Sequence, residues 1–143
     1  MTKIGIITCA NANQHGQCAT TMCLSGIRTG TDQFAQYNES GGAELVGISR
    51  CSGCPTAVAP ERILEGIRPL YQLGAEKVHL ASCMMAICPF KNKYIKVIEA
   101  EYPEMEVVAG THAPPPGYEE QFVEGMRVVM SQKKLTLGDL LKK

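Results

Sequence analysis

The stretch Lys3-Ile4-Gly5-Ile6-Ile7-Thr8-Cys9 is apolar along most of its length, is rich in β-branched residues and ends in a cysteine. A continuous apolar run of this kind is typical of a strand that is buried on both faces of a parallel sheet. Three later runs have the same character and are each followed by a loop; they cover residues 45–49, 78–81 and 107–109. We therefore predict four buried strands.

Segments with the spacing of amphipathic helices lie between these runs. They cover residues 60–73, followed by Gly74, and residues 94–102, followed by Pro103. Further helices are expected at residues 31–37, at residues 118–130 and around Asp139, and residues 10–21 are expected to form a long polar loop. Alternating strands and helices imply parallel strands joined by right-handed crossovers. The sequence predicts one α/β domain over residues 1–143, with a doubly wound, mainly parallel sheet of four to five strands and helices on both faces, a three-layer arrangement of flavodoxin or Rossmann type.

The charge balance of the chain excludes several kinds of partner. Lys plus Arg and Asp plus Glu both total 14, so there is no basic field to attract phosphate backbones or anionic lipid. The first residues have the pattern of a strand rather than of a secretory signal, and no apolar run is long enough to span a bilayer. We expect a cytoplasmic protein whose partners include neither nucleic acid nor a membrane.

Seven cysteines are many for a chain of 143 residues, and in a reducing compartment they indicate metal or redox chemistry. Parallel α/β sheets bind their ligands at the carboxyl ends of the strands. All four predicted strands bring a thiol or an imidazole to that edge. In chain order, these residues are Cys9, Cys51 with Cys54, Cys83 and His112. If the strand order is two, one, three, four, Cys9 lies between Cys51 and Cys83 on strands roughly 5 Å apart. We predict a metal site formed by these four cysteines, with His112 as a further ligand or an active-site base.

The remaining cysteines form weaker patterns. The spacings Cys18-x4-Cys23 and Cys83-x4-Cys88 do not distinguish a pair of ligands from two packed thiols, and free cysteine is among the most buried residue types. Cys18, Cys23 and Cys88 are therefore second-tier ligands, which could form a second site. His79, inside the third predicted strand, is expected to be a hydrogen-bonded core residue.

Converging thiolates suit tetrahedral zinc or an iron–sulfur cluster, because both need several thiolates that a scaffold holds together. The turn Cys51-Ser52-Gly53-Cys54 is also open to thiol–disulfide exchange without a metal, because the N-terminus of a following helix lowers the pKa of a nearby cysteine. A site in the crevice where doubly wound folds bind substrates favours a role towards a small molecule or in redox chemistry. The sequence identifies no substrate and leaves open whether the protein is an enzyme.

These residues resemble the CGGC-domain family of small prokaryotic proteins, whose cysteines and histidines imply metal binding, usually of zinc. The naming motif is present as Cys51-Ser52-Gly53-Cys54. The other matches are the opening stretch up to Cys9, the pair Cys18 and Cys23, Ala81-Ser82-Cys83-Met84, Cys88-Pro89 and Gly110-Thr111-His112. Ser52 replaces the first glycine of the motif, and Phe90 occupies a position where the family pattern has a histidine. The resemblance favours zinc, with an iron–sulfur cluster as the alternative.

Overall fold

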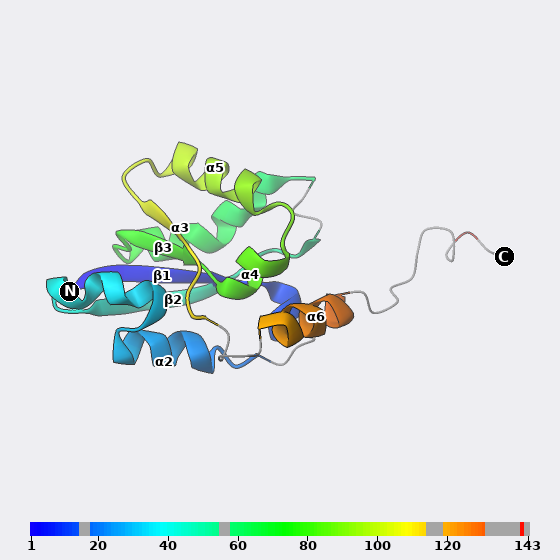
Figure 1. Ribbon diagram of the computed structural model, residues 1–143. Helices are drawn as coiled ribbons and strands as arrows, with labels where there is room; N and C mark the ends of the chain where they lie inside the picture. Colours follow the sequence, from blue (N-terminus) through cyan, green and yellow to red (C-terminus); the bar gives the residue numbers. More distant parts are fainter. Residues whose placement is uncertain (15–17, 55–57, 114–118, 131–140, 142–143) are drawn as a thin grey trace.

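The sheet of this protein is fully parallel and follows the predicted strand order (Figure 1). The computed structural model describes residues 1–14, 18–54, 58–113, 119–130 and 141. In the described residues the strands are β1 Thr2–Thr8, β2 Ala43–Arg50, β3 Lys77–Leu80 and β4 Glu106–Ala109, in the order β2-β1-β3-β4. The predicted α/β class and the four predicted strands are confirmed.

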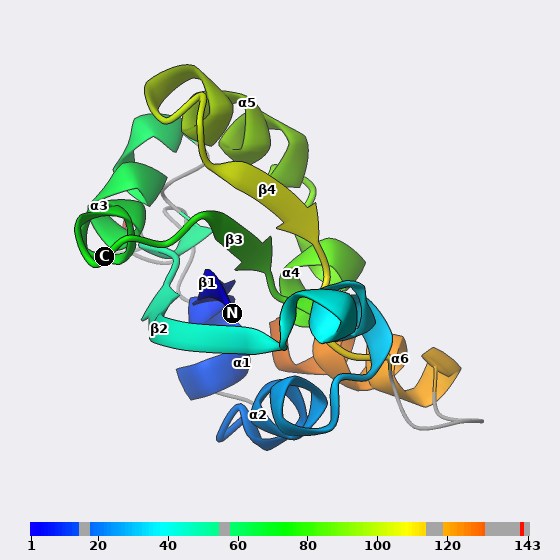
Figure 2. The same ribbon diagram turned by 90° about the vertical axis from the view of Figure 1, so that its left-hand side faces the viewer.

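Helices cover both faces of this sheet (Figure 2). They are α1 Ala10–Gln14, α2 Thr21–Thr29, the 3-10 helices η1 Asp32–Ser40 and η3 Pro60–Ile63, α3 Leu64–Gln72, α4 Ser82–Ile87, α5 Lys91–Glu101 and α6 Glu119–Met130. The helices predicted at residues 60–73, 94–102 and 118–130 are observed, and the segment at residues 31–37 is part of η1. The helix expected around Asp139 lies outside the described residues. Within the described part of the chain, no helix has the length and apolar character needed to cross a membrane.

The prediction of a loop at residues 10–21 is wrong in part, because α1 occupies the first residues of this segment and α2 begins at its end. The sequence pattern also gave no sign of α2, which contains two threonines, a serine and a glycine, all weak helix formers. Packing stabilises this helix: a Cβ atom on Gly26 would lie 2.9 Å from Cδ2 of Phe34, so α2 lies very close to η1. Gly30 ends the helix in the left-handed conformation, with φ 61°.

Two apolar cores lie on the two faces of the sheet, because successive side chains of a strand point to opposite faces. On β1, Ile7 belongs to the first core and Ile4 with Ile6 to the second. The first core packs against α3 and α5 and includes Cys9, Ile63, Ile67, Leu70, Leu80, Met84, Tyr94 and Ile98. The second packs against α2 and η1 and includes Cys23, Phe34, Tyr37 and Ala81. The carboxyl end of β1 therefore borders both cores.

His79 of β3 is fully buried and both of its ring nitrogens are engaged. Its Nδ1 lies 2.8 Å from the carbonyl oxygen of Gly110, and its Nε2 lies 2.7 Å from the hydroxyl oxygen of Tyr37. Because a carbonyl only accepts, Nδ1 carries the proton and Nε2 accepts from Tyr37. Burial lowers the pKa of His79, which favours the neutral ring. The predicted role as a hydrogen-bonded core histidine is confirmed.

Candidate functional site

The carboxyl ends of the strands bring the cysteines to one edge of the sheet. Cys9 follows β1 directly and Cys51 follows β2 directly, and the N–H of Cys51 donates to the carbonyl of Thr8 at 2.9 Å. Cys83 lies in the first turn of α4, just after β3, and His112 lies three residues after β4. With β1 between β2 and β3, Cys9 holds the central position that the strand order predicted.

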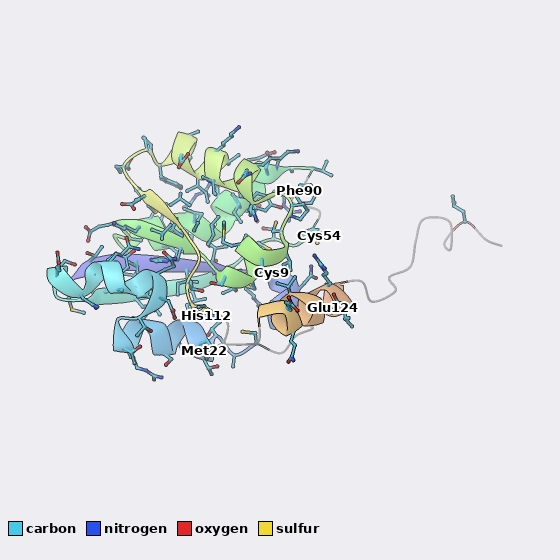
Figure 3. All side chains as sticks on the ribbon, in the orientation of Figure 1. Cys9, Met22, Cys54, Phe90, His112 and Glu124 are labelled. Carbon is cyan, nitrogen blue, oxygen red and sulfur yellow. The ribbon has the colours of Figure 1, made fainter. Side chains whose placement is uncertain are left out.

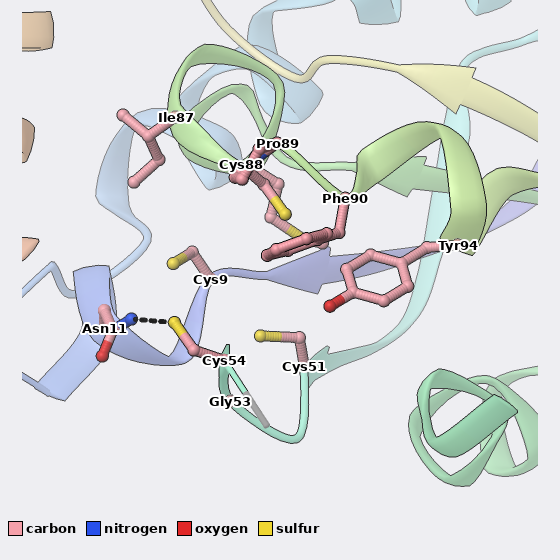
Figure 4. A pocket seen from close by; sticks show the side chains of 11 residues that line it. Cys9, Asn11, Cys51, Gly53, Cys54, Ile87, Cys88, Pro89, Phe90 and Tyr94 are labelled. Atoms are coloured by element: carbon pink, nitrogen blue, oxygen red, sulfur yellow. Dashed lines mark hydrogen bonds between the residues drawn. The ribbon is translucent and has the colours of Figure 1, made fainter. Parts of the chain in front are cut away.

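A first cavity, of about 40 Å³, lies at this edge on the side of α5 (Figure 4). Four cysteines line it: Cys9, Cys51, Cys54 and Cys88. The remaining walls are Asn11, Gly53, Met84, Ile87, Pro89, Phe90 and Tyr94. None of these residues carries a charge at neutral pH apart from the thiols themselves, so the thiols dominate the chemistry of the cavity.

Cys9 and Cys51 form a hydrogen-bonded pair of thiols in this cavity. The hydrogen bond from Cys9, with smaller effects from the N–H groups of Ala10 and Gly53, lowers the pKa of Cys51 to about 6 despite burial. The same bond, together with burial, raises the pKa of Cys9 well above its usual range. The N–H of Ala10 donates to Sγ of Cys51 at 3.5 Å. At neutral pH the pair therefore shares one proton and carries one negative charge.

The turn that joins Cys51 to Cys54 has the geometry that its sequence requires. Gly53 has φ 94°, in the left-handed region that favours glycine. Ser52 stays outside that region and its hydroxyl donates to the carbonyl of Arg62 at 3.3 Å, so the turn accepts a serine where the family motif has glycine. The side-chain amide of Asn11 donates to Sγ of Cys54 at 3.2 Å (Figure 4). This bond ties the exposed thiol of Cys54 to α1.

Cys88 enters the cavity from the end of α4. Burial raises its pKa, and the negative charges of Cys51 and Cys54 raise it further. The charges of Cys51 and Cys54 thus make ionisation of Cys88 more costly, whereas the hydrogen bond from Cys9 makes ionisation of Cys51 easier. Phe90 lines the same cavity with an apolar ring.

A second cavity, of about 130 Å³, lies on the α2 side of the same sheet edge. Its walls are Thr8, Ala12, Cys18, Thr20, Thr21, Met22, Cys23, Ala81, Cys83 and His112. In Figure 3, Phe90 and Cys54 lie towards α5, whereas His112 and Met22 lie towards α2. Both cavities are lined by thiols, but only the lining of the second also includes an imidazole, that of His112.

Cys23 is hydrogen-bonded to two partners in the second cavity. Sγ of Cys23 lies 3.3 Å from Oγ1 of Thr111, and its other partner is the ring of His112. Burial opposes ionisation of Cys23, but its hydrogen bonds with His112 and Thr111 and the charge of His112 together lower its pKa. The bond to Cys23 raises the pKa of His112. The pair is therefore biased towards thiolate and imidazolium.

Cys83 lies between the two cavities. It lines the second cavity and packs against both cores. Burial raises the pKa of Cys83, and the N–H of Cys9 offsets part of that effect through a hydrogen bond to its sulfur. In the described residues, as the side chains stand, no three Cys, His, Asp or Glu residues lie close enough together to hold a metal ion.

The predicted ligands are thus divided between two places. The structure brings Cys9, Cys51 and Cys54 together with the second-tier Cys88. It groups Cys83 and His112 with the second-tier Cys18 and Cys23 instead. Sequence reasoning missed this division because α2 and α4, which place Cys23 and Cys88, were not predicted. The four-residue gap between Cys83 and Cys88 was the available signal, since it fits one short helix with a cysteine near each end.

The comparisons with known proteins identify the family of the chain. The chain is 28% identical over 116 residues to an uncharacterized protein of Methanocaldococcus jannaschii, an alignment that covers 77% of this chain and 86% of that protein. No solved structure matches the chain. The sequence model of the CGGC domain matches residues 3–112, which include every cysteine and His112. The chain therefore belongs to the CGGC domain family.

Proposed function

We propose that the protein binds one thiophilic metal ion, with Zn²⁺ preferred, through Cys9, Cys51, Cys54 and Cys88. The observation that carries the proposal is that four thiols from β1, β2, the turn after β2 and the end of α4 line one small cavity. Sulfur ligands from well-separated parts of the chain, supported by backbone N–H groups, are characteristic of zinc sites that contain only cysteine.

The charge distribution of the cavity supports the binding of a cation. Cys51 is a thiolate at neutral pH, and its charge and that of Cys54 oppose ionisation of Cys88. A divalent cation in the cavity would relieve this repulsion and lower the pKa of the remaining thiols, because metal binding displaces the thiol protons. Small movements of the Cys51–Cys54 turn and of Cys88 would have to complete the coordination shell.

The size of the cavity favours a single ion over a cluster. About 40 Å³ is room for roughly three water-sized atoms, since one such atom needs about 10–15 Å³ by this measure. A cluster of several irons and sulfides is larger than that. An iron–sulfur cluster remains the alternative cofactor, and its visible absorption distinguishes it from colourless zinc.

The test is metal binding by the full chain, purified under anaerobic conditions and analysed for zinc and iron. We expect one equivalent of zinc, and after removal and replacement by Co²⁺ we expect the spectrum of a tetrahedral ion with thiolate ligands. Cys54→Ser should weaken Zn²⁺ binding at least tenfold, whereas Cys18→Ser, in the other cavity, should leave it unchanged. Equal losses in both variants would place the metal elsewhere, and broad visible absorption with bound iron would favour the cluster.

A second candidate function follows from the contact between Cys9 and Cys51. Two hydrogen-bonded thiols, one of them ionised near neutral pH, are suited to form a disulfide with each other. This candidate replaces the predicted Cys51 and Cys54 dithiol with a pair from adjacent strands. If the chain binds neither zinc nor iron, oxidation should yield a Cys9–Cys51 disulfide, which peptide mapping would identify.

A further inference from the structure

We propose that the second cavity is a separate thiol-exchange site, in which Cys23 attacks a small disulfide and His112 donates the proton to the departing thiol. The site lies outside the proposed metal ligands and needs no metal. Its basis is the arrangement of Cys23, His112 and Thr111 at the wall of a cavity that is about three times larger than the first, 130 Å³ against 40 Å³.

The backbone holds His112 in one orientation. Its Nδ1 lies 3.0 Å from the carbonyl oxygen of Ala113, and because a carbonyl only accepts, Nδ1 is the donor. This leaves Nε2 as the ring nitrogen available to Cys23. A cysteine beside a histidine whose other nitrogen is fixed is the arrangement of an activated nucleophile and its base.

Ser82 fixes the segment that carries His112. The Ser82 hydroxyl donates to the carbonyl of His112 at 2.6 Å and accepts from the N–H of Thr111 at 3.0 Å. The N–H of Ser82 donates to Oγ1 of Thr111 at 3.2 Å. The Thr111 hydroxyl also donates to Oγ of Ser82 at 3.3 Å. Four hydrogen bonds thus join the segment after β4 to the start of α4, and they hold Thr111 and His112 in position beside Cys23.

Cys23 lies in the first turn of α2, a helix of nine residues. The partial positive charge at the start of a helix favours a thiolate at that position. The side chain of Cys23 is buried but forms part of the cavity wall, so its sulfur is reached through the cavity. The Thr111 hydroxyl accepts from Cys23 and donates to Oγ of Ser82, so it would have to give up the bond to Ser82 in order to donate to a Cys23 thiolate.

The size and lining of the cavity indicate the substrate class. About 130 Å³ is room for roughly ten water-sized atoms, which suits a low-molecular-weight disulfide and excludes a folded protein from the cavity itself. The lining is hydroxyl-bearing and apolar, with Cys18 and Cys83 as further thiols. Among the described residues, these two cysteines are titratable neighbours of Cys23 and His112. Asp32 is another, and its charge raises the pKa of His112.

The exchange is balanced in two steps. The Cys23 thiolate attacks one sulfur of the disulfide, the sulfur–sulfur bond breaks, and the leaving thiolate takes the proton of His112 to become a free thiol. The neutral ring of His112 then takes the proton of the Cys18 or Cys83 thiol, and the thiolate so formed attacks Sγ of Cys23. The bond between Sγ and the substrate sulfur breaks, and the departing thiolate takes the proton from His112 to leave as the second thiol. The small disulfide is the oxidant: it is reduced to two thiols, while two protein thiols are oxidised to one disulfide.

The experiment uses the reduced full chain with and without Zn²⁺, treated with hydroxyethyl disulfide at pH 7, quenched with acid and mapped by mass spectrometry. Without metal, we expect Cys51 and Cys23 to be modified first. With Zn²⁺, we expect protection of Cys51 and continued modification of Cys23. His112→Gln should slow modification of Cys23 about tenfold and move the midpoint of its pH profile upward, because the variant lacks both a group that lowers the pKa of Cys23 and the acid that protonates the departing thiol. Thr29→Ala, on α2 but outside the cavity, should leave the rate unchanged.

The outcomes separate this proposal from the metal site. If Cys23 reacts no faster than cysteines of the chain unfolded in urea, or if His112→Gln leaves the pH profile as it was, the exchange site is refuted. Protection of Cys23 by Zn²⁺ would also overturn it, because the metal would then occupy the second cavity. If Zn²⁺ binds nowhere in the protein, the proposed metal site fails. The thiol-exchange site is then tested by the rate of Cys23 modification in the metal-free protein.

Discussion

The two cavities share one sheet edge but differ in what surrounds their thiols. In the first, the thiols interact mainly with one another, and Cys51 ionises because Cys9 keeps the shared proton. In the second, Cys23 ionises because His112 accepts the proton. A cluster of thiols attracts a cation, whereas a thiolate hydrogen-bonded to an imidazolium is already neutralised and can act as a nucleophile.

The difference arises from the alternation of side chains along β1. Ile7 and then Cys9 belong to the core under α3 and α5, and Ile4 and Ile6 belong to the core under α2 and η1. Each cavity is therefore the open end of a different core. Cys83 packs against both and is the point where one cavity could influence the other.

Removal of a large side chain from one core should affect only the cavity on that face. Phe34 is 1% exposed and its ring lies 4.8 Å from that of His79, so Phe34→Ala should destabilise the protein by about 3–5 kcal/mol. In the fraction that stays folded, we expect altered thiol reactivity of Cys23 and unchanged reactivity of Cys51. Urea unfolding and alkylation followed by peptide mapping measure both effects.

Ile67→Ala is the matched variant on the opposite face. Ile67 is fully buried in α3, and its truncation should lower the free energy of unfolding by about 2–5 kcal/mol. We expect altered thiol reactivity of Cys51 and unchanged reactivity of Cys23. Equal changes at both cysteines in either variant would show that the cavities are one coupled site, and the comparison above would fail.

The pH dependence of alkylation should distinguish the thiols within the first cavity. In metal-free protein, reaction of Cys51 should rise with a midpoint near pH 6, since the hydrogen bond from Cys9 lowers its pKa to about 6. Cys88, whose pKa is raised above the ordinary value of 9.0, should react only in alkaline solution. At pH 7 Cys51 is largely ionised and Cys88 is largely protonated, so we expect Cys51 to react faster than Cys88, although its lower basicity reduces its intrinsic nucleophilicity.

The sign of this effect follows from the direction of the shift. A lowered pKa makes Cys51 the more reactive thiol as the pH falls from 9 towards 6, and the advantage is lost below pH 6, where Cys51 takes up its proton. Iodoacetamide with quantitative mass spectrometry measures both profiles. Coincident profiles for Cys51 and Cys88 would mean that Cys9 and Cys51 do not share a proton.

The sequence allowed prediction of the strands, their order and the cysteines that end them, because buried parallel strands have a strong apolar pattern. It did not predict α2, which contains several weak helix formers and packs closely against η1 through Gly26 and Phe34. For that reason the sequence could not place Cys23 beside His112. Nor could the sequence show that His112 and Cys9 lie at different cavities. Strand order determines which strand ends are adjacent, but it does not determine towards which face of the sheet the loop after a strand turns.

The smallest expected effect concerns Ser52, the residue that departs from the family motif. Its hydroxyl donates to the carbonyl of Arg62 at 3.3 Å and joins the Cys51–Cys54 turn to η3. The bond is long and exposed, so Ser52→Gly should lower the free energy of unfolding by only about 0.5 kcal/mol. Zn²⁺ binding should weaken by about twofold, because the turn becomes slightly less ordered before the metal binds.

Ser40→Gly provides the matched control for this change. The hydroxyl of Ser40 also donates to a backbone carbonyl, that of Tyr37 at 3.0 Å, and neither cavity includes Ser40. We expect a similar loss of stability from Ser40→Gly and no change in Zn²⁺ affinity, as measured by urea unfolding and by competition with a chromophoric chelator. If Ser52→Gly instead weakens Zn²⁺ binding tenfold or more, the bond to Arg62 holds the turn in its metal-binding conformation. In that case the serine is part of the design of the first cavity, and the turn does not tolerate glycine and serine equally.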